Sequence, residues 1–236
     1  MCRGLDMVIL GVCMLALLGQ GAATSAGALS EPGSSESARL MHPITTLMTF
    51  ADGTTEVKHG QGFVVGNRLF TVYHTLAPRM KNLLPTKREI YVAGRLMTPM
   101  YTDSVHDIAV FEIPETLCKP HCTTLAASHL PTLNPDRQVY WVQKMGDERL
   151  VMEGRIQHYA WLSETPPAFH AGAETPCQRN LIVEVDMPFR PGTSGSPVFD
   201  ATTDAIVGMI QGSLLRAGGD TGYFKPMSCL LPLAQL

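Results

Sequence analysis

Residues 44–76, "ITTLMTFADGTTEVKHGQGFVVGNRLFTVYHTL", are the stretch that decides the fold class. Short runs rich in Thr, Val and Phe are separated there by Asp52-Gly53 and Gly66-Asn67. Such dipeptides between strand-like runs predict β-hairpins, because Gly, Asn and Asp tolerate the positive φ angles of tight hairpin turns. The stretch therefore predicts consecutive antiparallel strands.

The rest of the chain continues this pattern of short apolar runs, with almost no helical periodicity. Further strands are expected at residues 89–92, 108–113, 139–143, 150–159, 181–186, 197–199 and 205–211. Residues 118–136 are rich in Pro, Thr, Ser and Asn, which indicates a connection between two β units. The sequence thus predicts an all-β fold, either a sandwich or barrels.

The charge balance argues against some classes of partner. The chain has 236 residues, 17% of them charged, and a formal net charge of −3. No strongly basic segment attracts nucleic acid or an anionic membrane. We expect no nucleic-acid partner, and no membrane association beyond an uncleaved signal anchor.

The N-terminal segment has the layout of a secretory signal peptide. Arg3 precedes an apolar run, Met7–Leu18, and small residues follow up to Ala28. The run is short for a membrane span, which needs about 20 residues. We expect a signal peptide over residues 1–26, a flexible linker over residues 27–40, and an exported protein, periplasmic or secreted; an uncleaved anchor is the alternative.

Four cysteines remain if the signal peptide is removed, namely Cys118, Cys122, Cys177 and Cys229. Export permits disulfides, and four cysteines allow three pairings that the sequence cannot distinguish. Our preference is Cys118 with Cys122 and Cys177 with Cys229. His121 between the first two also raises a zinc site, but no second ligand pair stands at a zinc-finger spacing. We expect no metal.

"RPGTSGSPVFD", residues 190–200, sets Ser194 in a glycine-rich turn before a strand-like run. A hydroxyl is a weak nucleophile unless a base takes its proton and dipoles receive the oxyanion. Gly192 lets backbone N–H groups turn toward one point, and Gly195 leaves space for a substrate. Ser194 is the candidate nucleophile; Ser196, which does not fit the Gly-x-Ser-Gly pattern, is the weaker alternative.

His74 and Asp107 complete a candidate constellation. His74 follows an apolar strand in "NRLFTVYHTLAP", and Asp107 directly precedes the strand at 108–113. The imidazole suits a general base, and a carboxylate can orient it and stabilise its protonated form. Asp103 and His106 are interpreted as loop residues. The other histidines are expected to be surface or structural residues: His42, His59, His121, His129, His158 and His170.

The order His74, Asp107, Ser194 is the chain order of the chymotrypsin arrangement. The chain resembles trypsin-like, chymotrypsin-fold serine proteases, and bacterial HtrA-type protease domains most of all. "GQGFVVGNRLFTVYHTL", "HDIAVFEI" and "PGTSGSPVFD" resemble the three blocks of that family. The similarity spans about residues 46–213. Only 23 residues follow Ser213, so no PDZ domain is expected.

The resemblance implies two six-stranded antiparallel β-barrels with the active site in the cleft between them. The protease domain would span 41–236, with the first barrel at about 41–120 and the second at about 136–236. His74 would be the base, Asp107 its orienter and Ser194 the nucleophile of an acyl-enzyme. The N–H groups of Gly192 and Ser194 would form the oxyanion hole. No cofactor is implied.

Two positions depart from the digestive members of the family. Thr193 replaces the Asp that switches a zymogen on, so activation by N-terminal insertion is not expected. Pro188 stands where an Asp would select Arg or Lys, so a small or medium uncharged residue before the cut is expected. The predicted substrate-binding residues are Pro188, Phe189, Arg190, Gln211, Gly212 and Ser213.

The sequence therefore predicts an exported serine endopeptidase acting on proteins or peptides. A protease-fold binding protein without activity and a serine esterase are the alternatives. Neither the physiological substrate nor the oligomeric state can be inferred from the sequence.

Overall fold

The computed structural model describes residues 41–79, 84–114, 134–145, 148–161, 180–215 and 219–235. These residues fall in one compact unit, Glu31–Leu236. The predicted signal peptide and linker, and the connection around residues 118–133, lie outside the described residues. The predicted domain bounds stay predictions.

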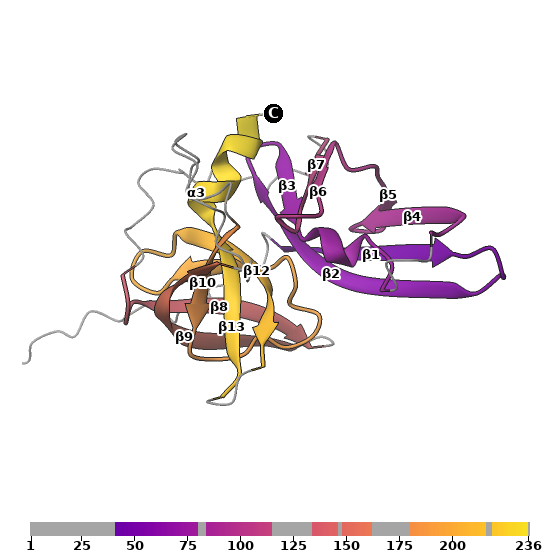
Figure 1. The fold of residues 1–236 in the computed structure, drawn as a ribbon. Coiled ribbons are helices and arrows are strands. Elements are labelled where there is room, and N and C mark those ends of the chain that lie inside the picture. The colour runs from indigo at the N-terminus through magenta and orange to yellow at the C-terminus, as the bar shows by residue number, and fades with distance from the viewer. Residues whose placement is uncertain are drawn as a thin grey trace, which may run out of the picture. The chain divides into compact units, whose positions relative to one another are not determined.

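The N-terminal half forms one seven-stranded sheet with the order β5-β4-β1-β2-β3-β7-β6 (Figure 1). Its elements are β1 (Met41–Thr49), β2 (Thr55–Val65), β3 (Arg68–Thr71), the short 3-10 helix η1 (Tyr73–Thr75), β4 (Lys87–Val92), β5 (Arg95–Leu96), β6 (Tyr101–Asp103) and β7 (Ile108–Glu112). Both predicted hairpins are present, because β1 pairs with β2 and β2 pairs with β3 in antiparallel register. Gly53 and Gly66, in the two turns, have φ angles of +80° and +62°.

The C-terminal half forms a closed barrel with the strand order β10-β13-β12-β11-β8-β9. Its strands are β8 (Gln138–Met145), β9 (Glu148–Trp161), β10 (Leu181–Val185), β11 (Pro197–Asp200), β12 (Ile206–Leu214) and β13 (Thr221–Pro226). The helix α3 (Met227–Leu230) and the 3-10 helix η3 (Leu231–Gln235) follow. The all-β fold class is confirmed, with one closed six-stranded barrel and a seven-stranded sheet in place of the other.

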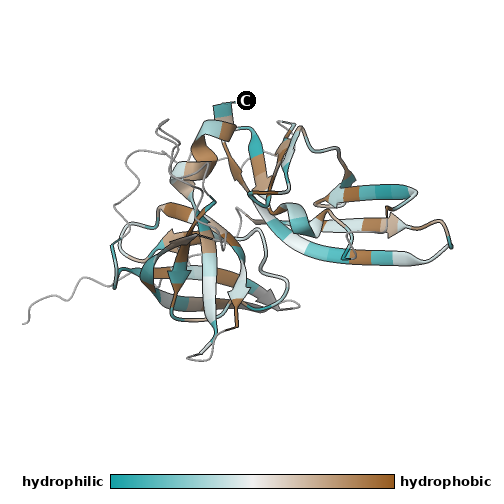
Figure 2. Ribbon diagram, viewed as in Figure 1, coloured by the Kyte–Doolittle hydropathy of each residue, from teal (hydrophilic) through white to brown (hydrophobic). Residues whose placement is uncertain are grey.

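The two sheets share a hydrophobic core. Successive side chains of a strand point to opposite faces; buried and less buried residues alternate along β1, whereas β3 and β11 are buried on both faces. Figure 2 shows apolar residues in the strands of both sheets. One buried cluster joins Phe63, Phe70 and Val110 of the first sheet to Tyr140 and Met209 of the barrel. A second cluster, built around Trp141 and Phe224, fills the barrel itself. This packing holds the segments that carry the candidate site against each other.

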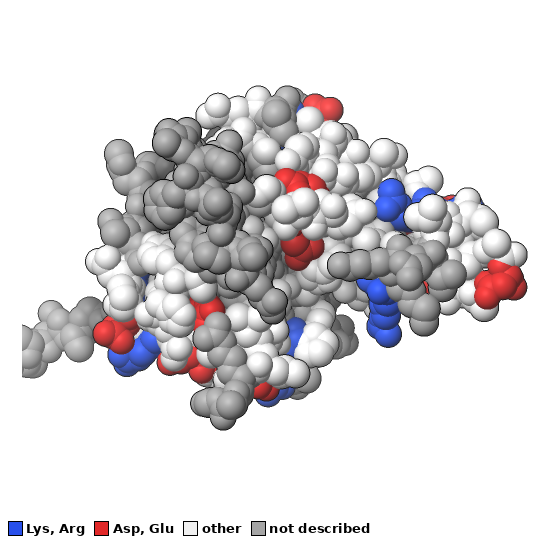
Figure 3. All heavy atoms as spheres, in the orientation of Figure 1, with Lys and Arg blue, Asp and Glu red and all other residues white. Residues whose placement is uncertain are grey.

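The surface carries no field of one sign on the face seen in Figure 3, where acidic and basic side chains lie in small separate groups. No helix within the described residues is long and apolar enough to cross a membrane.

Candidate functional site

His74 and Asp107 are joined by two hydrogen bonds, although 33 residues separate them. The chain leaves β3 at Thr71 and turns into η1, where the backbone N–H of His74 donates to Asp107 Oδ1 over 2.8 Å. The ring nitrogen Nδ1 of His74 lies 2.8 Å from Asp107 Oδ2. Both carboxylate oxygens thus hold the histidine, one through its backbone and one through its ring. A carboxylate on Nδ1 sets the tautomer in which Nε2 can accept a proton.

Asp107 itself sits in an unusual backbone conformation. Its φ angle is +56°, in the left-handed region that Asp adopts more readily than most residues. Asp103 holds the loop at residues 104–107: its Oδ1 accepts hydrogen bonds from the N–H groups of Val105 and His106 at 2.9 and 3.0 Å. Burial opposes ionisation of Asp103, but these hydrogen bonds and the ring of His106 lower its pKa overall. Asp103 therefore stabilises the loop that presents Asp107.

The same loop is also held from the barrel. Gln211, on β12 and 2% exposed, donates its Nε2 to the carbonyls of His106 and Asp107 at 2.8 and 3.3 Å. Asn180 donates its Nδ2 to the carbonyl of Val105 over 3.1 Å, and its Oδ1 accepts from Lys225 Nζ over 2.5 Å. Side chains of the C-terminal barrel thus fix the backbone around an acidic residue of the other sheet.

Lys225 is a fully buried cation beside this loop. Its side chain on β13 is 0% exposed. Burial lowers the pKa of its ammonium to about 8, while the carboxylates of Asp107 and Asp103 act in the opposite direction. A buried lysine is costly unless its charge is compensated, and here the compensation comes from Asn180 and two carboxylates.

The turn that carries Ser194 is docked between the two sheets. Gly192 and Gly195 have φ angles of +89° and +85°, which favour glycine. The N–H of Gly195 donates to the carbonyl of Ile210, and the N–H of Gln61 on β2 donates to the carbonyl of Ser194, each over 2.9 Å. A Cβ on Gly195 would lie 2.0 Å from the Gln61 carbonyl oxygen, so no other residue fits. The glycine thus permits the close approach of the turn to β2.

Two backbone N–H groups of this turn remain available for an anion. The N–H groups of Thr193 and Ser196 donate within the turn, and that of Gly195 donates to Ile210 on β12. Those of Gly192 and Ser194 donate to no acceptor among the residues that the structure describes. Backbone N–H groups that converge in a turn of this kind make an oxyanion-binding concavity.

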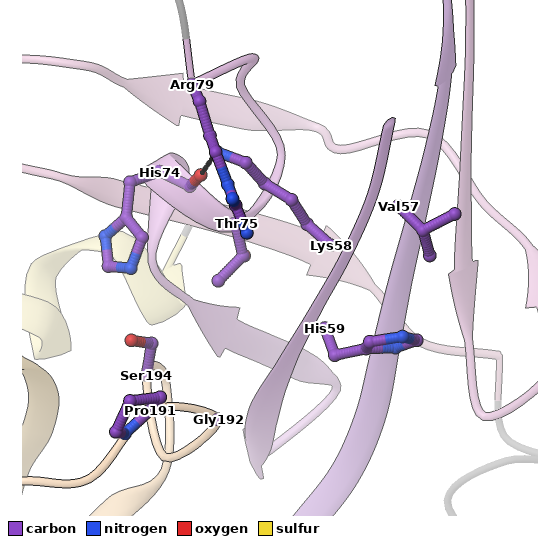
Figure 4. A pocket seen from close by; sticks show the side chains of 9 residues that line it. All are labelled: Val57, Lys58, His59, His74, Thr75, Arg79, Pro191, Gly192 and Ser194. Atoms are coloured by element: carbon purple, nitrogen blue, oxygen red, sulfur yellow. Dashed lines mark hydrogen bonds between the residues drawn. The ribbon is translucent and has the colours of Figure 1, made fainter. Parts of the chain in front are cut away.

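Ser194 and His74 line one cavity of about 460 Å³ (Figure 4). In that view the Ser194 side chain lies below the imidazole ring of His74. The other walls come from β2, η1 and the glycine turn, namely Val57, Lys58, His59, Thr75, Arg79, Pro191 and Gly192. The geometry can support proton transfer from a hydroxyl to an imidazole, next to donors for a developing oxyanion.

Ser196 and His106 do not line this cavity, whereas His59 does. Ser196 is 1% exposed and does not line the cavity, so its hydroxyl cannot meet a substrate there. His106 is paired with Asp103, at 2.5 Å between Nδ1 and Oδ2. His59, expected to be a surface or structural residue, lies on the cavity wall with its Nδ1 3.3 Å from the Thr45 hydroxyl.

Thr193 is buried within the glycine turn. It is 2% exposed, and its hydroxyl donates to the carbonyl of Arg190 over 2.6 Å. A local hydrogen bond from a neutral hydroxyl therefore holds the turn, with no partner needed from another segment.

The predicted substrate-binding residues fall into two groups. Phe189 packs edge-on against Trp141 in the barrel core, and the side chain of Gln211 is committed to the Asp107 loop, so only the main chains of Phe189 and Gln211 are available to a substrate. Pro188 and Arg190 are exposed, and Gly212 and Ser213 are half-buried. Ser213 Oγ donates to the Phe189 carbonyl over 3.0 Å, which ties the two segments together. Substrate contact by any of these six residues stays a prediction.

Sequence reasoning did not find Lys58, Asn180 and Lys225. Each is a common polar residue without a motif, and its role depends on contacts 16 to 75 residues away. The one available signal was for Lys225, a charge between Phe224 and Pro226 in a strand-like run.

Cys229, in α3, is disulfide-bonded. The predicted pairings stay predictions, because Cys118, Cys122 and Cys177 lie outside the described residues. The residues of the zinc alternative lie outside them as well.

Comparison with known proteins adds a family profile and a set of solved folds. The profile described as "Trypsin-like peptidase domain" matches residues 60–209. No curated protein matches the chain. The fold is similar to the Rv3671c protease from M. tuberculosis in its active form, with a TM-score of 0.56, 18% identity, and coverage of 83% of this chain and 80% of that one.

A second similar fold is the HtrA-type protease AlgW with a tripeptide. The TM-score is 0.57 at 17% identity, over 85% of this chain and 60% of AlgW. A serine-to-alanine mutant of Rv3671c, in its inactive form, gives a TM-score of 0.57 at 17% identity, over 91% and 94% of the two chains. At these identities the likeness concerns the fold alone.

Proposed function

Since this chain belongs to the family of trypsin-like peptidase domains, we propose that it is a serine endopeptidase that cleaves proteins or peptides through His74, Asp107 and Ser194. The observation that carries the proposal is that Ser194 and His74 line one cavity and that Asp107 holds His74. Asp107 holds His74 through two contacts of 2.8 Å, and Ser194 shares the cavity wall with His74. Such a pairing of hydroxyl, base and orienting acid serves acyl transfer on several unrelated folds.

In the proposed first step, Ser194 Oγ attacks the carbonyl carbon of the scissile peptide bond and its proton passes to His74 Nε2. The resulting oxyanion is received by the N–H groups of Gly192 and Ser194, which are preorganised by the turn. Asp107 keeps the ring in the required tautomer and stabilises the imidazolium. The intermediate collapses, the leaving nitrogen takes the proton from His74, and an acyl-enzyme on Ser194 remains.

In the second step a water molecule replaces the leaving amine. His74 accepts a proton from the water as its oxygen attacks the ester carbonyl, and the same N–H groups receive the second oxyanion. Collapse returns the proton to Ser194 Oγ and releases the new carboxyl terminus. Both steps use groups of the chain and water alone, so the mechanism requires no metal or organic cofactor.

The substrate before the cut is proposed to bind along residues 211–213 and 188–190. Segment 206–213 lies beside the glycine turn, since Gly195 donates to Ile210, and an extended peptide can pair with such a strand. Pro188 offers no charge for Arg or Lys, so we propose a small or medium uncharged residue immediately before the cut. A preference for Arg or Lys in a peptide library would refute this part.

We also propose that the protein is exported, to the periplasm or beyond. The N-terminal sequence has the layout of a signal peptide, and the disulfide-bonded Cys229 fits an oxidising compartment. Fractionation of the producing cells, with N-terminal sequencing of the mature protein, tests this; a cytoplasmic protein that keeps Met1 refutes it.

A fluorophosphonate probe tests the proposed chemistry directly. The probe reacts with an activated serine, so the wild-type chain should be labelled, and Ser194→Ala and His74→Ala should not. Labelling that persists in Ser194→Ala, or none in a folded wild type, refutes the proposal and favours a binding protein. Casein cleavage compared with turnover of small esters then separates a peptidase from an esterase.

A further inference from the structure

The cavity beside His74 extends along β2, away from the segments proposed to bind the substrate before the cut. None of residues 188–190 and 211–213 lines it. Its walls instead include Thr75 next to the base, and Val57 and Lys58 of β2. Because His74 must deliver its proton to the leaving nitrogen, the peptide after the cut leaves on the side of His74. The cavity therefore lies where the residues after the cut must pass.

Basic side chains outnumber the carboxylates available to pair with them around this cavity. Lys58 and Arg79 line it, and within the described ranges the carboxylate paired with both is Glu56. Glu56 Oε1 lies 3.9 Å from Lys58 Nζ and 3.5 Å from Arg79 Nε. A second carboxylate close to the cavity, Asp107, is engaged with His74. Two cations thus share the carboxylate of Glu56 at the cavity wall.

Lys58 is held in place as an incompletely compensated cation. Its side chain is 14% exposed, and its ammonium donates to the His74 carbonyl over 2.8 Å, which uses one of its N–H donors. Burial lowers the pKa of the Lys58 ammonium. The neighbouring charge of Arg79 lowers this pKa further, whereas the carboxylates of Glu56 and Asp107 raise it. An added carboxylate in the cavity would stabilise this ammonium.

Arg79 supplies the second cation at the mouth of the cavity. Its side chain is 80% exposed, and its backbone N–H donates to Glu56 Oε2 over 3.3 Å. Figure 4 shows the Arg79 side chain beside that of Lys58, above Thr75. A guanidinium in this position can form a two-point contact with a carboxylate that enters from solvent.

We propose that this cavity makes the enzyme select substrates with an acidic side chain, Asp or Glu, at the first or second position after the cut. Lys58 and Arg79 are the specificity-determining residues. Val57 and Pro191 provide apolar surface for the stem of the side chain. The inference rests on the proposed function, because it assigns the substrate class of the same site.

The first experiment maps the cuts. A peptide mixture is digested with the full chain, and mass spectrometry reads the residues that follow each cut. Quenched peptides with amidated C-termini, identical except for Glu or Gln after the cut, then give the ratio of kcat/KM values. The amide ensures that the side chain is the only new carboxylate. We expect a Glu-to-Gln ratio of about ten at low salt, which falls toward about two at roughly 0.5 M NaCl because salt screens exposed charges.

Charge variants test the residues. Arg79→Glu should bring the ratio below one, and Lys58→Met should lower it several-fold. Arg155→Glu is the matched control, since Arg155 is an exposed residue of β9 that does not line the cavity. It makes the same change in net charge and should leave the ratio unaltered. A wild-type ratio within twofold of one, or equal ratios in Arg155→Glu and Arg79→Glu, would overturn the inference.

Failure of the inference is distinguishable from failure of the proposed function. If peptides are cut at Ser194-dependent sites without a preference for acidic residues, the function stands and the specificity is wrong. If no peptide is cut and the fluorophosphonate probe does not react, the function is wrong and the specificity is wrong with it.

Discussion

The ammonium of Lys225 lies 2.5 Å from the amide oxygen of Asn180, and both groups belong to the part of the chain that braces the Asp107 loop. The lysine is fully buried on β13. Replacing a buried ion by an apolar side chain of similar size often stabilises a protein. Its charge acts on Asp103 and Asp107, and thus belongs to the electrostatic surroundings of the Asp107 loop.

The pH dependence of stability should reveal the buried charge. The pKa of Lys225 is lowered to about 8 in the folded protein, against about 10.4 for an unfolded lysine. Below pH 8 Lys225 is protonated in both the folded and the unfolded protein, so the folded protein carries the full free-energy cost of burying the ammonium. Between these values the unfolded chain binds more protons, so the free energy of unfolding rises with pH.

Lys225→Met lacks this titration. We expect denaturant unfolding to show that, from about pH 7 to about pH 10.5, the free energy of unfolding of the wild type rises on the order of 3 kcal/mol relative to that of Lys225→Met. The other titrating groups are common to both chains and cancel in the difference. Parallel curves across this range would show that the lysine is not a buried charge.

Gly195→Ala should abolish activity and cost more stability than its φ angle alone explains. The new Cβ would meet the Gln61 carbonyl oxygen at 2.0 Å, so the turn must leave β2 and move Ser194. We expect a loss of more than about 3 kcal/mol, of the kind seen for overpacking together with strain. Circular dichroism melts and probe labelling measure both effects.

Gly53→Ala is the control for Gly195→Ala. Gly53 has a similar φ angle of +80°, but an added Cβ meets nothing within 4 Å. It should cost about 1 kcal/mol from backbone strain and leave activity intact. Equal losses in the two variants would mean that the approach of the turn to β2 is unimportant.

Asp107→Asn should lower kcat by a factor on the order of 10³ to 10⁴, as expected when the histidine is held in the wrong tautomer. An amide can still meet the two contacts of 2.8 Å but can donate to Nδ1. Asp103→Asn should reduce kcat far less, because Asp103, which ends β6 and is not the loop residue that the sequence suggested, contacts Val105 and His106 and not the base. Equal losses of kcat in Asp107→Asn and Asp103→Asn would mean that Asp107 has no special role in orienting His74.

Gln211→Leu should reduce kcat about tenfold with little change in KM, because the variant removes the donor to the partly buried carbonyls of His106 and Asp107. A fully buried carbonyl without a donor costs about 1–3 kcal/mol, and a partly buried one costs less. Steady-state kinetics with one peptide measure the two constants. Gln157→Leu, an exposed position on β9, is the control. A large rise in KM with unchanged kcat would instead assign Gln211 to substrate binding.

The sequence by itself determined the strands and the identity of the candidate triad. Alternation of apolar residues and the turn dipeptides depend on neighbours in the chain, so both hairpins and the strands at residues 89–92 and 197–199 were predictable. The strand β13 was missed, because "TGYFKP" is short and carries a lysine at a buried position. The sequence also did not predict that the N-terminal sheet has seven strands, because β5 and β6 have only two and three residues.

Only the tertiary structure decided what surrounds the triad. The commitment of Gln211 to the Asp107 loop, the burial of Phe189 in the barrel and the cation pair Lys58 and Arg79 arise where distant segments meet. Hydrogen bonding and desolvation depend on distance in space, and local patterns do not encode which strands will face each other across two sheets. The sequence therefore identifies the groups that would do the chemistry, whereas packing sets their support and their charge environment.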